Sequence, residues 1–448
     1  MAMGRRKILR RLIILVFVLS LSGCFIAIIH LTRIERKIDE KREAHVDKVD
    51  LGVDPRIPKV ATHIIQPRKP VGNKTNIIDR HFEKENPVRV LNKTSAYTTN
   101  DKVHAFYYPW YGNPEYDGEF LHWDHKYLPH WDKKQAKKWK SGQHVPVDDI
   151  GANFYPELGC YSSRDPKVIN AHMQYMYKAR VGVLVVSWYP PGKADNEGHP
   201  SDDLMPILLD AAHRYQLKVA IHSEPYKDRD ETTVKADLKY IMSRYGNHPA
   251  LYRYGPKSLP LIYLYDSYLT PARKWKSLLK PGGQLSIRGT DHDAVLIALL
   301  VEEKHMSEIS NSGFDGLYTY FAATGFTYGS TYRHWSRLAK YATEKGMLFI
   351  PSIGPGYIDV NIRPWNGENT RSRSDGSYYE TAFKNALQTN PDIISITSFN
   401  EWHEGSQIEP AIPKSIPKFT YLDYGKNGPN YYLDLTRKWV EKFESNTY

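Results

Sequence analysis

Short apolar runs recur along the chain beyond residue 100, and helix-like stretches separate them. Most of these runs lack polar alternation, as is typical of strands buried on both faces of a parallel sheet. The pattern predicts eight strands: His104–Pro109, Val181–Trp188, Lys218–Ser223, Leu259–Tyr265, Ala294–Val301, Gly316–Phe321, Leu348–Ser352 and Ile393–Phe399. It predicts eight helices, over residues 165–180, 202–216, 231–246, 271–280, 302–312, 331–345, 376–390 and 430–444.

Eight strands alternating with eight helices predict one α/β domain over residues 101–448, a (β/α)8 TIM barrel. Asp165-Pro166 and Ser201-Asp202-Asp203 are typical helix starts. A doubly wound open sheet is the alternative fold. Against it, the first strand is followed by Trp110-Tyr111-Gly112-Asn113-Pro114 rather than by a glycine-rich phosphate turn.

The N-terminus has a different pattern. An apolar run, Leu12–Leu31, follows a cluster of five arginines and lysines, and as a helix it would span roughly 30 Å, the thickness of a bilayer core. The run is longer than the apolar region of a cleaved signal peptide. A lipoprotein modified at Cys24 is a further alternative, but the chain stays apolar after that residue. We therefore predict a cytoplasmic tail (residues 1–11) and an uncleaved transmembrane signal-anchor (residues 12–31).

Residues 32–100 show no sustained hydrophobic period and carry mixed charge, which predicts a disordered stem. Two N-glycosylation sequons begin in this stretch, at Asn73 and Asn92, and none begins in residues 101–448. Lys and Arg flank the span on both sides, so the positive-inside rule decides little. The sequons favour a luminal stem, and hence a single-pass type II membrane protein of the secretory pathway.

The charge of the chain is concentrated at its N-terminal end. Of the formal net charge of +11, residues 1–100 hold 20 basic against 10 acidic side chains, and the remainder holds 41 against 40. A near-neutral domain lacks the spread basic face of a nucleic-acid-binding protein. The two cysteines, Cys24 and Cys160, cannot form a disulfide framework or a zinc-finger ligand set.

In a barrel of this class, functional residues lie where strands end and the following loops begin. Almost every predicted strand end carries an aromatic side chain, a carboxylate or both, as at Tyr107–Tyr111, Ser187–Tyr189, His222–Tyr226, Tyr265-Asp266 and Tyr318–Phe321. Aromatic faces stack on sugar rings, and carboxylates bind hydroxyls or move protons. The repetition at one rim predicts a carbohydrate pocket.

The segment after the eighth strand holds the most specific chemistry. Glu401 and Glu404 lie three residues apart, as suits glycoside cleavage, where one group protonates the leaving oxygen and another removes a proton or attacks. A buried acid beside a second carboxylate has a raised pKa and keeps its proton near neutral pH. The alternative is a pair of surface glutamates in a loop.

The metal-site interpretations are weaker. His403-Glu404 begins like a zinc-protease signature, but Gln407 stands where the second histidine belongs. The sequences His122–His125 and His130–Asp132 alternate histidine and acid with tryptophan, and we interpret them as a folded loop over the barrel mouth. The polar segment Gly192–Gly198 predicts a second loop there, mobile when empty and ordered on substrate.

Over residues 101–444 the sequence resembles the endo-α-1,2-mannosidases of glycoside hydrolase family 99. The matching segments include Phe106–Pro114, Asp148–Gly151, Tyr155–Gly159, Tyr161–Pro166, Ser187–Pro191, Gly313–Gly316, Pro351–Asp359 and Asn400–Glu409. The resemblance implies a retaining Golgi hydrolase that releases glucosyl-mannose from glucosylated high-mannose N-glycans of glycoproteins. It implies no metal or organic cofactor.

The resemblance also implies roles for single residues. Glu401 would deprotonate the 2-hydroxyl of the substrate, giving a 1,2-anhydro sugar, and Glu404 would protonate the leaving mannose. Substrate contacts are expected from the aromatic, amide and acidic residues Tyr108, Trp188, Glu224, Tyr318 and Asn400.

Two other functions remain open. One is a catalytically inactive, membrane-tethered glycan-binding barrel. The other is a Golgi glycosyltransferase, which requires an Asp-x-Asp metal motif. Asp228-Arg229-Asp230 and Asp291-His292-Asp293 have that spacing, but both lie in charged, loop-like segments.

Overall fold

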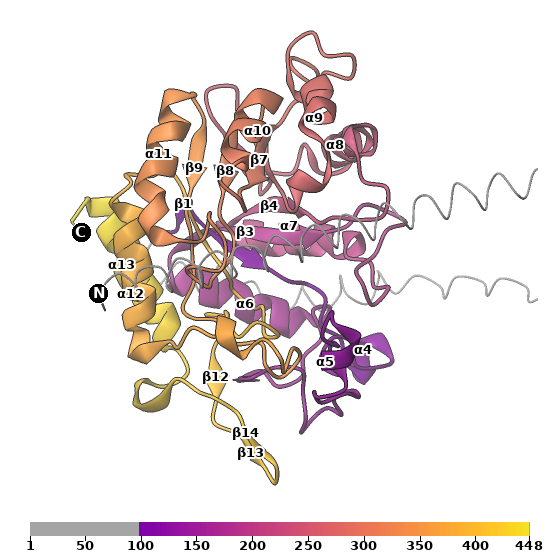
Figure 1. Cartoon of the computed structure of the whole chain (residues 1–448), viewed down its shortest axis with the longest axis vertical. Helices are drawn as coiled ribbons and strands as arrows, with labels where there is room; N and C mark the ends of the chain where they lie inside the picture. The colour runs from indigo at the N-terminus through magenta and orange to yellow at the C-terminus, as the bar shows by residue number, and fades with distance from the viewer. Residues whose placement is uncertain (1–97, 448) are drawn as a thin grey trace, which may run out of the picture. The chain divides into compact units, whose positions relative to one another are not determined.

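The computed structural model of the chain describes residues 98–447 (Figure 1). The predicted tail, the predicted membrane span at residues 12–31, nearly all of the stem and both sequon asparagines, Asn73 and Asn92, lie outside the described residues. Between residues 98 and 447, no helix has the length and apolar character needed to cross a bilayer.

Nine parallel strands form the barrel: β1 (Asn100–Tyr107), β3 (Val181–Trp188), β4 (Lys218–Ser223), β6 (Leu259–Leu264), β7 (Val295–Leu299), β8 (Gly316–Tyr318), β9 (Leu348–Ile350), β10 (Ser352–Ile353) and β11 (Ile394–Ile396). The strands β9 and β10 are one run divided at Pro351, which has no backbone N–H to give to a ladder. The first half pairs with β8 and the second with β11, which in turn pairs with β1. The sheet therefore closes on itself, which confirms the predicted α/β barrel and excludes the open sheet.

The helices on the outside of the barrel match the eight predicted ones: α6 (Pro166–Lys178), α7 (Met205–Arg214), α8 (Glu231–Tyr245), α9 (Ala272–Leu279), α10 (His305–Ser312), α11 (Trp335–Glu344), α12 (Ser377–Leu387) and α13 (Tyr431–Ser445) (Figure 1). Asp165 caps α6 by accepting from Lys167 N, as predicted. Ser201 makes no side-chain cap: its Oγ accepts from Tyr189 N at 3.1 Å, and a 3₁₀ turn over Asp202–Leu204 precedes α7. Asp202 instead accepts from Trp188 Nε1 at 2.7 Å.

Short elements that the pattern did not predict build the loops. They are the helices α4 (Pro114–Asp117) and α5 (Lys133–Ala136), the antiparallel pair β2 (Tyr155–Pro156) and β12 (Ala411–Ile412), the strand β5 (Arg253–Tyr254), and the hairpin of β13 (Ser415–Ile416) and β14 (Phe419–Thr420). Elements of two to four residues carry too few side chains to show a hydrophobic period. Residues 109–165, between β1 and α6, form the longest of these additions.

An aromatic layer fills the barrel below the carboxyl ends of the strands. Phe106, Tyr263 and Tyr318 are fully buried there, and the Tyr263 and Tyr318 rings are 5.0 Å apart. Burial lowers the pKa of the neighbouring His104 to about 3, so this histidine is neutral. The layer closes the barrel interior and supports the loops above it.

Candidate active site

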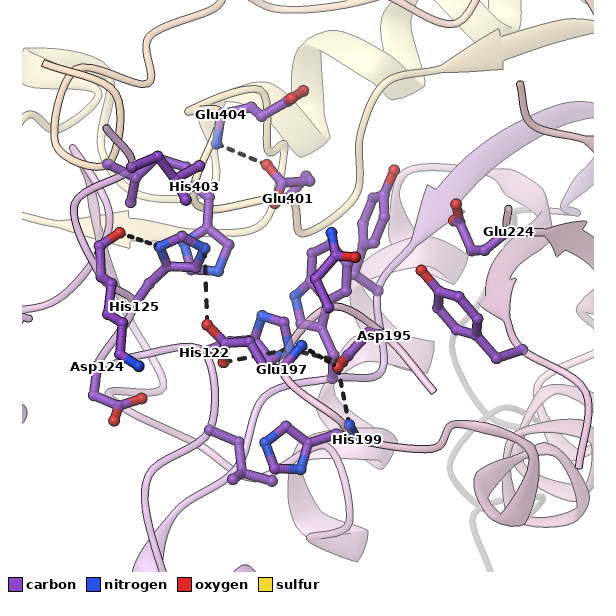
Figure 2. Close-up of a pocket in the computed structure, with 18 of the residues that line it drawn as sticks. His122, Asp124, His125, Asp195, Glu197, His199, Glu224, Glu401, His403 and Glu404 are labelled. Carbon is purple, nitrogen blue, oxygen red and sulfur yellow. Dashed lines mark hydrogen bonds and ion pairs between the residues drawn. The ribbon is translucent and has the colours of Figure 1, made fainter. Parts of the chain in front are cut away.

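A cavity of about 830 Å³ lies at the carboxyl ends of the barrel strands. Figure 2 shows Glu401 and Glu404 on one side of it, with Glu224 and Asp124 at opposite ends. The loops after β1, β3, β4, β6, β8 and β11 all contribute to its wall, through Tyr108, Tyr189, Glu224, Tyr265, Tyr320 and Glu404 among others. The predicted pocket is therefore present at the predicted rim.

A tight turn directs Glu401 and Glu404 into this cavity. Glu401 N donates to Ser398 Oγ at 2.8 Å, and Glu404 N donates to Glu401 Oε2 at 2.7 Å. The side chain of Glu404 is 22% exposed, whereas Glu401 as a residue is only 3% exposed. The sequence spacing of three residues thus becomes a pair of carboxyl groups on one wall, the inner one held by the backbone of the outer.

Burial raises the pKa of both carboxyl groups. It raises that of Glu404 to about 7, and it raises that of Glu401 well above its ordinary value, with a further increase from the charge of Glu404. Two neighbouring carboxylates do not readily ionise together, so the pair keeps protons to a higher pH than free glutamate does. The acid and base roles of the two groups stay predictions.

The guanidinium group of Arg363 lies beside Glu404 and affects the pKa of its carboxyl group. Arg363 Nη1 lies 3.8 Å from Glu404 Oε1 and 3.0 Å from Asp359 Oδ2. The positive charge of Arg363 lowers the pKa of Glu404 and the negative charge of Asp359 raises it, both more weakly than burial does. Asp359 itself is fully buried and also accepts from Tyr357 Oη and Asn366 Nδ2. The hydrophobic pattern does not indicate either residue, because both lie in an irregular loop, although Asp359 ends one of the segments that match the family.

Glu224 occupies the far end of the cavity in Figure 2. It is 7% exposed and accepts from Ser187 Oγ at 2.8 Å, and His222 Nδ1 lies 3.0 Å from the same carboxylate oxygen. The other ring nitrogen of His222, Nε2, lies 2.8 Å from Tyr318 Oη. The carboxylate of Glu224 is thus held in place at this end of the cavity.

The two predicted mouth loops meet over the cavity. His122 Nε2 contacts Asp195 Oδ2 at 2.9 Å, and His125 Nε2 lies 3.8 Å from Glu197 Oε1. The ring of His122 also stacks on Trp110, with centroids 4.6 Å apart. The His122–His125 sequence is therefore part of a folded loop at the mouth, as interpreted. In residues 98–447 no group of three or more histidines, cysteines and acids is placed to hold a metal ion.

The structure divides the seven predicted site residues into two groups. Glu401, Glu404, Tyr108 and Glu224 line the cavity. The other three, Trp188, Tyr318 and Asn400, are fully buried outside its lining.

Each of these three has a partner that explains its place. Trp188 faces outward to Asp202 and to the Tyr240 ring of α8. Tyr318 belongs to the aromatic layer below the cavity. Asn400 exchanges two hydrogen bonds with the backbone of Tyr108, at 2.7 and 2.9 Å, and so joins the ends of β1 and β11.

A sequence model of glycosyl hydrolase family 99 matches residues 98–445. This chain belongs to glycosyl hydrolase family 99. Similar proteins include the rat glycoprotein endo-alpha-1,2-mannosidase, 55% identical over 344 residues, which are 76% of this chain and 74% of the rat protein. A human glycoprotein endo-alpha-1,2-mannosidase-like protein is 56% identical over 76% of this chain and 75% of its own length.

Among solved structures, the GH99 endo-alpha-mannosidase from Bacteroides thetaiotaomicron is similar to this chain with a TM-score of 0.73. The two are 44% identical, and the match covers 78% of this chain and all of the bacterial one. As a member of family 99, this chain is a glycoside hydrolase. Cavity-wall residues that the sequence pattern did not indicate include Arg363, Gln143 and His199.

Proposed function

We propose that this chain is a retaining endo-α-1,2-mannosidase that trims glucosylated high-mannose N-glycans of glycoproteins. The observation that carries the proposal is the Glu401–Glu404 pair on one wall of the cavity, where burial raises the pKa of both carboxyl groups. The same reaction is supported by the names of three similar proteins: the rat and human relatives and the bacterial enzyme of known structure.

In the first step, Glu401 removes the proton of the mannose 2-hydroxyl, and O2 attacks C1 as the glycosidic bond breaks. The proton of Glu404 passes to the leaving oxygen, so a neutral 1,2-anhydro sugar and a neutral alcohol result. Burial and the charge of Glu404 raise the pKa of Glu401, so this step requires the form of the pair in which Glu404 holds the proton and Glu401 is ionised. The chain's own residues supply every proton in this step.

In the second step the roles reverse. Glu404, now ionised, takes a proton from water as the water oxygen attacks C1, and Glu401 returns its proton to O2 as the three-membered ring opens. Two inversions at C1 give net retention. The backbone contact from Glu404 N to Glu401 Oε2 keeps the inner carboxylate in place through both steps.

The proposal extends to the cellular site. The apolar run at residues 12–31 and the two sequons support a type II protein of the Golgi membrane with a luminal catalytic domain. Occupied sequons would give a mass decrease on enzymatic deglycosylation. That decrease should vanish when both Asn73 and Asn92 are replaced by Gln.

The experiment that tests the activity is a digest of a defined glucosylated oligomannoside, with the released fragment sized by mass. We expect a glucosyl-mannose fragment from the wild type and none from Glu404→Gln. Glu302→Gln is the matched control, because Glu302 also follows a barrel strand but pairs with Lys304 outside the cavity. Release by Glu404→Gln at the wild-type rate would overturn the assignment.

A further inference from the structure

We propose that Trp131 and Trp365 form a sugar-binding platform for the leaving-group part of the oligosaccharide, beyond the rim of the cavity. This inference rests on the proposed function, and it assigns a binding site to two residues outside the catalytic wall. Trp131 lies just before α5, and Trp365 lies in the loop that also carries Arg363.

The platform is continuous with the cavity. Leu128, Ile362 and Arg363 all line the cavity. Leu128 N donates to Ile362 O at 2.7 Å, which joins the two loops. Trp365 Nε1 donates to Leu128 O at 3.0 Å, so this indole is fixed directly behind the lining.

Trp131 is held in place and yet open to solvent. The indole ring of Trp131 packs edge-to-face with that of Trp365. The two ring centroids are 4.9 Å apart, and the ring planes meet at 89°. The ring of His130 covers part of it, 3.8 Å away and tilted by 30°. Trp131 nevertheless remains 66% exposed, which leaves apolar ring surface facing water. An exposed aromatic side chain fixed by its neighbours at the edge of a pocket is typical of a ligand-binding site.

The position of the acid decides which part of the substrate would reach this platform. Glu404 gives its proton to the leaving oxygen, so the leaving sugar lies on the Glu404 side. Arg363 Nη1 is 3.8 Å from Glu404 Oε1 and therefore lies on that side too. Glu224 lies at the other end of the cavity (Figure 2). From Arg363 the chain leads in two residues to Trp365 and its partner Trp131. The released fragment is small, whereas the leaving part carries the remaining mannoses, so most of the substrate lies on this side.

Sugar rings are the chemistry that fits. The C–H faces of mannose stack on aromatic rings, and the platform offers exposed ring surface on Trp131. Binding here adds affinity only for substrates long enough to span from Glu404 to Trp131. It therefore discriminates between substrates by size and leaves the chemical step unchanged.

The test compares two substrates, a short glucosyl-mannosyl-α-1,2-mannoside and a full glucosylated high-mannose glycan. Trp131→Ala should raise KM for the full glycan about fivefold or more, with kcat and the kinetics of the short substrate unchanged. Trp131→Phe, which keeps an aromatic face, should recover part of the affinity. The matched control is Trp139→Ala, because Trp139 is also exposed in the same lysine-rich segment, at 41%.

The outcomes are distinguishable. Suppose that the wild type cleaves both substrates and that Trp131→Ala has the wild-type KM and kcat for each. Trp131 is then an ordinary surface residue, and the platform is refuted. An equal loss on both substrates would also refute it, because that result indicates a structural role. If the wild type cleaves neither substrate, the proposed function itself fails.

Discussion

Glu401 and Glu409 belong to the same loop and are both buried, at 3% and 0% exposure, but their surroundings differ. Glu409 accepts from Tyr161 Oη at 2.9 Å and from Trp402 Nε1 at 2.9 Å, and its other oxygen lies 3.0 Å from His172 Nε2. Glu401 accepts one backbone N–H, that of Glu404, and otherwise faces the cavity.

The difference separates a structural carboxylate from a reactive one. Donors on both oxygens of Glu409 compensate the cost of its burial, and they fix Trp402 and Tyr161 beneath the catalytic turn. Glu401 lacks that compensation, so burial raises its pKa well above the ordinary value. A buried acid with spare oxygen capacity beside a cavity is therefore the better indicator of chemistry.

The largest expected effect concerns Glu401. Glu401→Gln should lower kcat by about 10³-fold, because the 2-hydroxyl loses its base. The melting temperature should stay the same or rise, because the substitution removes a poorly compensated buried charge. Turnover of the defined glycan and thermal unfolding measure the two. A large loss of stability would contradict the comparison.

For Glu409→Leu we expect the main effect on stability rather than on turnover. Loss of a fully buried acceptor leaves Tyr161, Trp402 and His172 without their partner, and we expect the free energy of unfolding to fall by about 3 kcal/mol. Urea unfolding measures this. If Glu409→Leu proved as stable as the wild type, the carboxylate would have no structural role.

The pH dependence of stability follows from the raised pKa of Glu404. Unfolded glutamate ionises near 4.5, whereas folded Glu404 keeps its proton until about pH 7. The folded state therefore binds more protons in this window, and stability decreases as the pH rises from about 4.5 to about 7. Glu404→Gln should remove that part of the decrease. If the melting temperatures of the wild type and Glu404→Gln changed with pH in parallel, Glu404 would not be the source of the pH dependence.

The smallest effects concern the charges behind Glu404. Arg363→Gln should move the alkaline limb of the kcat/KM profile upward by about one pH unit, because a positive charge that lowers the pKa of Glu404 is lost. Asp359→Asn should move it downward, because a negative charge that raises the same pKa is lost. If both variants moved the kcat/KM profile in the same direction, the charges of Arg363 and Asp359 would not be what sets the pKa of Glu404.

The sequence predicted the barrel because its strands are buried on both faces and its helices are long enough to show a period. The sequence also predicted that Glu401 and Glu404 lie together at the rim, because they follow a strand at a spacing that one turn brings together. Trp188 was harder. Neighbouring residues of a strand point to opposite faces, so Ser187 reaches Glu224 inside the rim while Trp188 packs outside against α8.

Arg363 and Trp365 could not be predicted from the sequence for another reason. They lie in an irregular loop, and only tertiary contacts place them beside Glu404 and Leu128. Local sequence pattern carries no information on such contacts.

We propose that Glu401 and Glu404 act in two successive steps at one anomeric carbon. Proton NMR of the digest at early times, before the released sugar equilibrates between its anomers, distinguishes two steps from one. We expect glucosyl-mannose to appear first as the α-anomer, the configuration of the bond that is cleaved. Initial release of the β-anomer would mean a single displacement by water, and the two-step mechanism would then be wrong.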